Sequence, residues 1–165
     1  MDFISQMNSV LDQLEASKEE PSVLITIGTG AKCFCSGFDL KYWALNPVNM
    51  LLSLVEFQKV LARFLELGIP SMAVFNGHAI AGGAFLGMVH DRIIMNSDKK
   101  FIIQLNELTF GKAPPYSYIR ILKETTSPRV GRTLLMGTKL SPSEAERLDL
   151  VQALYSNDSE LEKEI

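Results

Sequence analysis

The sequence has few of the residues that build metal sites or disulfide frameworks. Its 165 residues include only two cysteines and two histidines. Cys33 and Cys35 are separated by one residue, which is too close for an easy disulfide bond, so we expect reduced thiols in an intracellular protein. A zinc site needs four ligands, and no second cysteine pair or histidine cluster supplies the remainder. The sequence therefore predicts no bound metal ion.

Long apolar runs and an excess of positive charge are also missing. No window approaches the length of a membrane span, and the net charge of −3 with a pI near 5.4 gives no reason to expect nucleic acid. The first residues carry acids but no lysine or arginine, which argues against a secretory signal or a transit peptide. The last three residues are not the peroxisomal tripeptide. We expect an intracellular protein with no membrane span and no nucleic-acid partner.

The sequence does contain an alternation of strand-like and helix-like segments. We interpret residues 1–165 as a single domain. Helical patterns cover residues 3–17, 49–67, 82–89, 116–123 and 129–136, and a helix start lies at 141–144. Short apolar runs typical of buried strands cover residues 23–27, 71–75, 92–95 and 101–103. This alternation predicts an α/β fold with parallel strands.

Two connections between a strand and a helix contain glycines. Residues 32–40 include Gly37, and Asp39 is a typical N-cap residue. Residues 76–85 are mostly small and include Gly82, but they match neither a P-loop nor a dinucleotide-binding fingerprint. Each connection is either a tight packing loop or a helix start that presents free backbone N–H groups. Two such N–H groups converging on one oxygen would form an oxyanion hole.

Together these segments resemble the crotonase (enoyl-CoA hydratase/isomerase) superfamily. Residues 34–40, FCSGFDL, resemble the motif F-x-x-G-x-D-[LI], and residues 76–83, NGHAIAGG, resemble N-G-x-x-x-[GA]-G-G. Three further matches follow in chain order, at residues 90–94, 105–111 and 141–151. The resemblance implies a crotonase-like superhelix of ββα turns, the ClpP/crotonase fold, which usually assembles as trimers or dimers of trimers.

The resemblance also implies roles for individual residues. Glu107 would be the catalytic base, and the backbone N–H groups of Phe38 and Gly82 would form the oxyanion hole. The CoA part of an acyl-CoA thioester would bind along Ser36, Gly37, Phe38, Asp39, Leu40 and Gly82. No separate cofactor is implied, because coenzyme A belongs to the substrate. Without the resemblance, Glu107 would be interpreted as an exposed acid of a surface loop.

Phe85 decides which reaction the resemblance favours. Typical hydratases of the family have a glutamate at this position and another at the position of Glu107, and the two hold a water molecule. Phenylalanine can neither accept a proton nor orient water. One carboxylate suffices for a 1,3-proton shift, so the sequence is most similar to Δ3,Δ2-enoyl-CoA isomerases, which act in fatty-acid β-oxidation. The compartment would be a mitochondrion or peroxisome in a eukaryote, or the cytoplasm in a bacterium.

Compared with the family, the chain is incomplete at both ends. The opening β-hairpin and the C-terminal helices, which often cover the acyl pocket and build the trimer, have no counterpart here. We therefore expect exposed apolar surface, and either a homotrimer or an assembly with partner subunits. The alternative function is a catalytically inactive, crotonase-like structural subunit of a larger complex.

Overall fold

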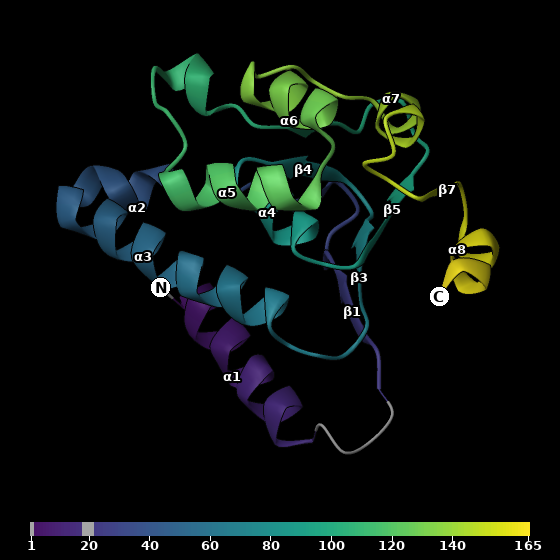
Figure 1. The fold of residues 1–165 in the computed structure, drawn as a ribbon, viewed down its shortest axis with the longest axis horizontal. Coiled ribbons are helices and arrows are strands. Elements are labelled where there is room, and N and C mark those ends of the chain that lie inside the picture. The colour runs from purple at the N-terminus through teal and green to yellow at the C-terminus, as the bar shows by residue number, and fades with distance from the viewer. Residues whose placement is uncertain (1, 18–21) are drawn as a thin grey trace.

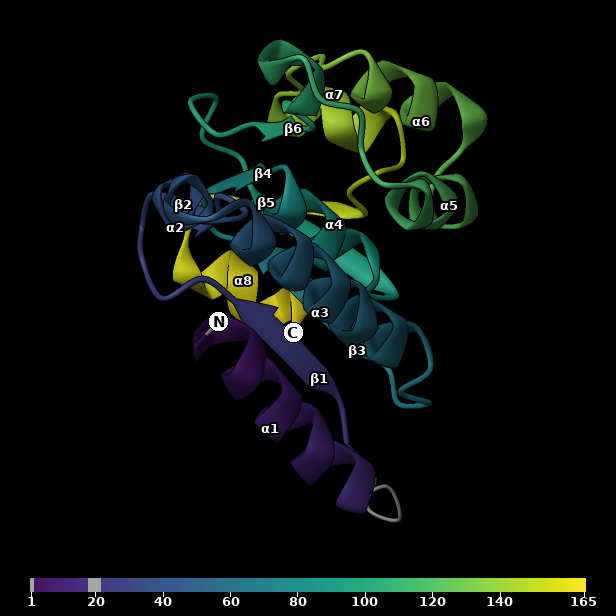
Figure 2. The same ribbon diagram turned by 90° about the vertical axis from the view of Figure 1, so that its left-hand side faces the viewer.

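The fold consists of two parallel sheets between which the chain alternates, with helices packed around them (Figures 1 and 2). The computed structural model describes residues 2–17 and 22–165. Neighbours in the first sheet run in the order β1 (Leu24–Ile27), β3 (Ser71–Phe75), β5 (Arg92–Asn96) and β7 (Ala153–Tyr155). The second sheet has the order β2 (Cys33–Cys35), β4 (His78–Ile80) and β6 (Ile103–Gln104). Within both sheets every neighbouring pair is parallel, which confirms the predicted α/β class.

The predicted helices are present to within a few residues at each end. The helices are α1 (Asp2–Ala16), α2 (Leu40–Leu45), α3 (Pro47–Leu65), α4 (Gly82–Met88), α5 (Tyr116–Thr125), α6 (Pro128–Leu135), α7 (Pro142–Arg147) and α8 (Asp158–Glu164). A short 3-10 helix, η1 (Glu107–Phe110), stands where we expected an irregular loop. In the described residues no helix is both long enough and apolar enough to cross a membrane.

The core lies where α3 and α4 cover the first sheet. Every residue of β3 is buried, as expected for a central parallel strand whose two faces are both covered. From α3, the side chains of Phe57, Leu61 and Phe64 enter the same core. This packing holds the carboxyl end of β3, and the loop that follows it, in a fixed position.

His90, just after α4, is a buried polar residue in this core. Its Nε2 lies 2.8 Å from the Thr26 hydroxyl and its Nδ1 lies 2.9 Å from the Leu86 carbonyl oxygen. Burial lowers the pKa of His90 to about 4, although hydrogen bonding to the backbone of Leu86 and Gly87, and then the Asp91 carboxylate, act in the opposite direction. The neutral ring is therefore part of the folded state at neutral pH.

We expect His90 to make the protein less stable in mild acid. Between pH 7.5 and pH 5 the unfolded histidine takes up a proton while the folded one stays neutral, so protonation favours unfolding. The free energy of unfolding should fall by about 2 kcal/mol from this group. Urea denaturation at the two pH values measures the change. A His90→Gln variant should lack this contribution, and an equally steep pH dependence in the variant would contradict the assignment.

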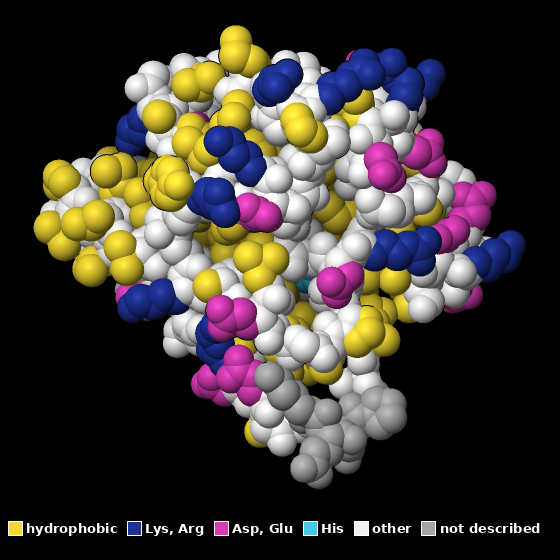
Figure 3. Space-filling view, viewed as in Figure 1, with side chains coloured by type: hydrophobic (Ala, Val, Ile, Leu, Met, Phe, Trp, Pro, Cys, Tyr) yellow, Lys and Arg dark blue, Asp and Glu magenta, His cyan; other side chains and the backbone are white. Residues whose placement is uncertain are grey.

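Apolar side chains remain exposed along α2 and the first half of α3. They form the yellow cluster on the left of Figure 3, where Figure 1 places these two helices. We call this surface the α2–α3 apolar face; its members are Leu40, Leu45, Val48, Leu51, Leu52 and Val55. The exposed apolar surface that the sequence predicted is therefore present on this side of the molecule.

Candidate active site

The two glycine-containing loops meet at Gly37 and Gly82. Gly37 has a φ of +87°, a left-handed conformation that glycine adopts without strain. A β-carbon built on Gly37 would lie 3.1 Å from the Gly82 nitrogen, so the two backbones are in direct contact. The structure therefore brings together the two loops that the sequence analysis paired.

Asn76 ties the start of the second loop to the end of β1. Its Oδ1 accepts a hydrogen bond from the Gly28 N–H at 3.1 Å, and its Nδ2 donates to the Gly28 carbonyl oxygen at 2.7 Å. The same Nδ2 also donates to the Gly30 carbonyl oxygen at 3.1 Å. Sequence reasoning recognised Asn76 only as part of a turn, because its partners lie more than forty residues away.

Two local features flank the candidate oxyanion N–H groups. Asp39 caps α2, since its Oδ1 accepts hydrogen bonds from the N–H groups of Lys41 at 2.9 Å and Tyr42 at 3.2 Å. Ala81 precedes α4 with a φ of 51°, a conformation that costs a non-glycine residue energy and is often found at functional sites. Among the described residues, neither the Phe38 N–H nor the Gly82 N–H has a backbone acceptor.

A cavity of about 510 Å³ borders these two residues. Four other predicted site residues were Ser36, Gly37, Asp39 and Leu40; the first three line the cavity and Leu40 does not. Helices α1, α2 and α3 contribute the apolar side chains of Ile4, Trp43 and Phe57 to the lining, and β2 contributes that of Phe34. The Phe38 ring packs against Trp43, with ring centroids 4.8 Å apart, and meets Phe57 edge-on at 5.2 Å.

Glu107 is the first residue of η1, and it does not line this cavity. Its Oε2 is fully buried and has no hydrogen-bond partner among the described residues. Burial raises the pKa of the Glu107 carboxyl group, and a hydrogen bond from its own backbone opposes this less strongly. The interpretation of Glu107 as an exposed surface acid is therefore wrong.

A group of aromatic rings includes Phe57, which lines the cavity, and Tyr118, which is influenced by the charge of Glu107. Tyr118 is stacked on Phe85, with centroids 4.7 Å and planes 23° apart, and it meets Phe57 edge-on at 6.4 Å. Burial raises the pKa of Tyr118, and the negative charge of Glu107 raises it further. The two groups therefore lie within electrostatic range of each other. Sequence reasoning missed Tyr118, because one aromatic residue in an amphipathic helix is typical of a core position.

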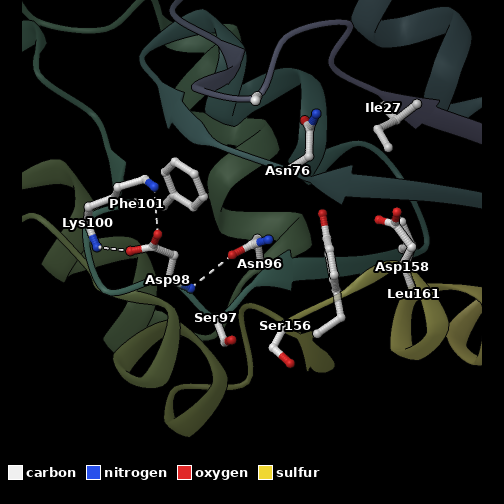
Figure 4. Close-up of a pocket in the computed structure, with 12 residues that line it drawn as sticks. Ile27, Asn76, Asn96, Ser97, Asp98, Lys100, Phe101, Ser156, Asp158 and Leu161 are labelled. Atoms are coloured by element: carbon white, nitrogen blue, oxygen red, sulfur yellow. Dashed lines mark hydrogen bonds and ion pairs between the residues drawn. The ribbon is translucent and has the colours of Figure 1, made fainter.

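A larger cavity of about 550 Å³ lies at the carboxyl ends of β1, β3, β5 and β7 (Figure 4). Its polar groups are paired with one another: the Asp98 N–H donates to Asn96 Oδ1 at 2.9 Å, and Lys100 forms an ion pair with Asp98 at 2.6 Å. None of the predicted site residues lines it. In the part of the chain that the structure describes, no three histidine, cysteine, aspartate or glutamate residues are grouped to hold a metal ion.

Comparison with known proteins identifies the family of the chain. A family model described as "Enoyl-CoA hydratase/isomerase" matches residues 1–165. "Enoyl-CoA delta isomerase 3" of Arabidopsis thaliana is 33% identical, with 96% of this chain covering 68% of that protein. "Enoyl-CoA delta isomerase 2, peroxisomal" of the same plant is 34% identical, with 95% of this chain covering 68% of that protein.

Solved structures show the same fold. The crystal structure of an enoyl-CoA hydratase from Bacillus anthracis matches 98% of this chain with a TM-score of 0.86 and 25% sequence identity. The chain spans 62% of the length of that hydratase, less than two thirds. The model match over the whole sequence, the two plant relatives and the shared fold lead to one conclusion: the chain belongs to the enoyl-CoA hydratase/isomerase family of the crotonase superfamily.

Proposed function

We propose that the chain is a Δ3,Δ2-enoyl-CoA isomerase, which converts a 3-enoyl-CoA to the trans-2-enoyl-CoA. The observation that carries the proposal is the contact between Gly37 and the Gly82 nitrogen. Beside this contact, the N–H groups of Phe38 and Gly82 border one cavity, and neither has a backbone acceptor among the described residues. The names of the two plant relatives support the same reaction.

In the proposed mechanism, Glu107 removes a proton from C2 of the 3-enoyl thioester. The electron pair moves onto the thioester oxygen and gives a dienolate, and the Phe38 and Gly82 N–H groups donate hydrogen bonds to that oxygen. Each such donor is worth roughly 100-fold to 1,000-fold in rate. Protonated Glu107 then returns its proton to C4, which leaves the double bond between C2 and C3. The raised pKa of Glu107 suits a group that must both accept and return a proton near neutral pH.

Phe85 supports isomerisation over hydration. Its side chain is fully buried and stacked on Tyr118. The resemblance implies that hydratases of the family carry their second carboxylate at this position. An aromatic ring offers no lone pair to a water molecule. Glu107 therefore has no carboxylate partner at residue 85 with which to hold an attacking water.

We also propose that the CoA moiety binds along Ser36–Leu40, where Ser36 is exposed at the rim of the cavity. No cofactor beyond this moiety of the substrate is required for a proton shift. The proposed compartment is a peroxisome or mitochondrion in a eukaryote, or the cytoplasm in a bacterium; one of the plant relatives is named as peroxisomal.

A turnover assay with 3-hexenoyl-CoA tests the proposal. The expected product is trans-2-hexenoyl-CoA, identified by chromatography and by the absorbance of the conjugated thioester. When trans-2-hexenoyl-CoA is offered instead, we expect almost no 3-hydroxyhexanoyl-CoA. Hydration at a rate comparable to isomerisation would contradict the assignment, since it would require a second water-holding group.

The second candidate function is that of an inactive structural subunit, and the α2–α3 apolar face favours it. The six exposed apolar side chains of this face could contact a partner, which would be two further copies of this chain in a homotrimer or different subunits in a complex. A mass measurement in solution, run beside CoA-ester binding, separates the two functions. A chain that assembles only with other subunits and binds no CoA ester is expected for the structural role.

A further inference from the structure

Three buried side-chain atoms without hydrogen-bond partners belong to two consecutive elements of the chain. In the described residues these atoms are Glu107 Oε2, Ser117 Oγ and the Tyr118 hydroxyl oxygen. All three belong to η1 or to the first turn of α5. Each such atom costs roughly 1–3 kcal/mol, and unsatisfied groups in a folded protein call for an explanation, such as a catalytic role.

The ring of Tyr118 is packed on two sides while its hydroxyl is unpaired among the described residues. The residue is only 2% exposed, and its ring is fixed by stacking on Phe85 and by the edge of Phe57. A polar tip on a buried ring normally finds a partner. Here the carboxylate of Glu107 is the one charged group that acts on it electrostatically.

We propose that Tyr118 is the positioning residue of Glu107: its hydroxyl donates a hydrogen bond to the Glu107 carboxylate when an acyl-CoA occupies the site. This inference rests on the proposed function of Glu107 as the base. The hydrogen bond would hold the carboxylate in one orientation, and it would stabilise the charged form that takes the proton from C2.

The surrounding elements offer the Glu107 carboxylate no competing charge. The neighbouring helix α4 has no titratable residue, and the arginines of α6, Arg129 and Arg132, are exposed. On α3, Glu56 pairs with Lys59 at 2.7 Å, and on α5, Arg120 pairs with Glu124 at 2.7 Å. The Lys112 ammonium group lies over the Trp43 ring, 5.6 Å from its centroid.

The test compares Tyr118→Phe with Tyr116→Phe, a matched change at an exposed tyrosine two residues earlier on α5. We expect Y118F to lower kcat about 10-fold or more while KM stays within about two-fold. Without the donor, the pKa of Glu107 in the substrate complex rises, so the acid limb of the kcat profile, which reports that complex, should move to higher pH. Y116F should leave the rate and the pH profile unchanged.

The thermal stability of the free protein gives a second readout. Because the Tyr118 hydroxyl has no partner in the free protein, Y118F should melt at the same or a higher temperature than the wild type. Loss of folding in Y118F would overturn the inference, since it would show that the hydroxyl is needed structurally. An unchanged kcat and acid limb would also overturn it, as would an increase in KM alone, which would mean that Tyr118 only lines the acyl pocket.

Failure of the proposed function is distinguishable from failure of this inference. If Glu107→Gln keeps full turnover, Glu107 is not the base. If Glu107→Gln is inactive but Y118F has the wild-type pH profile, only the role of Tyr118 is wrong. The pKa of the Glu107 carboxyl can also be followed directly by carbon-13 NMR with hexanoyl-CoA bound, which needs no turnover. In this complex Y118F should raise the pKa of the Glu107 carboxyl group. A pKa identical to that of the wild type would overturn the inference.

Discussion

Replacing Glu107 with glutamine is expected to lower isomerase turnover about 1,000-fold, the middle of the range for loss of a general base. Glutamine has nearly the same shape but cannot accept the C2 proton. The fold should not suffer, because Glu107 Oε2 makes no hydrogen bond in the described residues and the uncharged amide is cheaper to bury. We therefore expect an inactive variant whose free energy of unfolding equals or exceeds that of the wild type.

The pH dependence of the wild-type enzyme provides a further check on the same residue. The base must be deprotonated to act, and burial raises the pKa of Glu107. The acid limb of the kcat/KM profile should therefore lie at a higher pH than an ordinary glutamate would give. Initial rates across the acidic range, at fixed ionic strength, measure its position.

The matched control for Glu107→Gln is Glu146→Gln, at an exposed acid on α7. Both variants should bind the unreactive ester hexanoyl-CoA as tightly as the wild type does, as measured by calorimetry. Substantial turnover in Glu107→Gln would contradict the proton-shuttle mechanism. Loss of ester binding would instead show that Glu107 holds the substrate, and the mechanism would need a different base.

Local rules predicted the elements whose signals lie within a few residues. The apolar periodicity of α3, the run of β3 and the cap at Asp39 each depend on neighbours along the chain, and all three are present. The strands β2, β4 and β7 have three residues each and were not predicted. They exist because they pair with strands far away in the sequence, and a pattern of three residues carries too little of that information.

The residues of the candidate site also fall into those that local sequence signals reveal and those that depend on distant contacts. The glycines and Asp39 were recognisable from turn and cap chemistry, whereas Glu107 stood out only through the resemblance to a family. The roles of Asn76 and Tyr118 could not be predicted, because they depend on contacts with Gly28 and Phe85, each more than thirty residues distant. The sequence therefore predicted the backbone of the site better than the side chains that orient it.

Substituting Gly83 with alanine is expected to destabilise the fold by about 3 kcal/mol or more, the high end for overpacking a core. A β-carbon on Gly83 would lie 2.1 Å from the Cys35 carbonyl oxygen and 2.6 Å from its carbonyl carbon. These are backbone atoms of β2, and they can give way only if the strand moves. Urea denaturation followed by circular dichroism measures the loss, and a variant within about 1 kcal/mol of the wild type would contradict the packing described here.

Gly82→Ala is the control for this substitution, and it separates two reasons for having adjacent glycines. A β-carbon on Gly82 would lie 3.3 Å from Phe38 Cε2, the edge of a half-buried ring that can shift by a few tenths of an ångström. We expect this variant to fold but to lose turnover, since the Phe38 ring and the Gly82 N–H border the same cavity. Gly83 is then required for packing between α4 and β2, and Gly82 for access of the thioester oxygen to the backbone. Equal effects of the two substitutions on both stability and turnover would show that the pair serves packing alone.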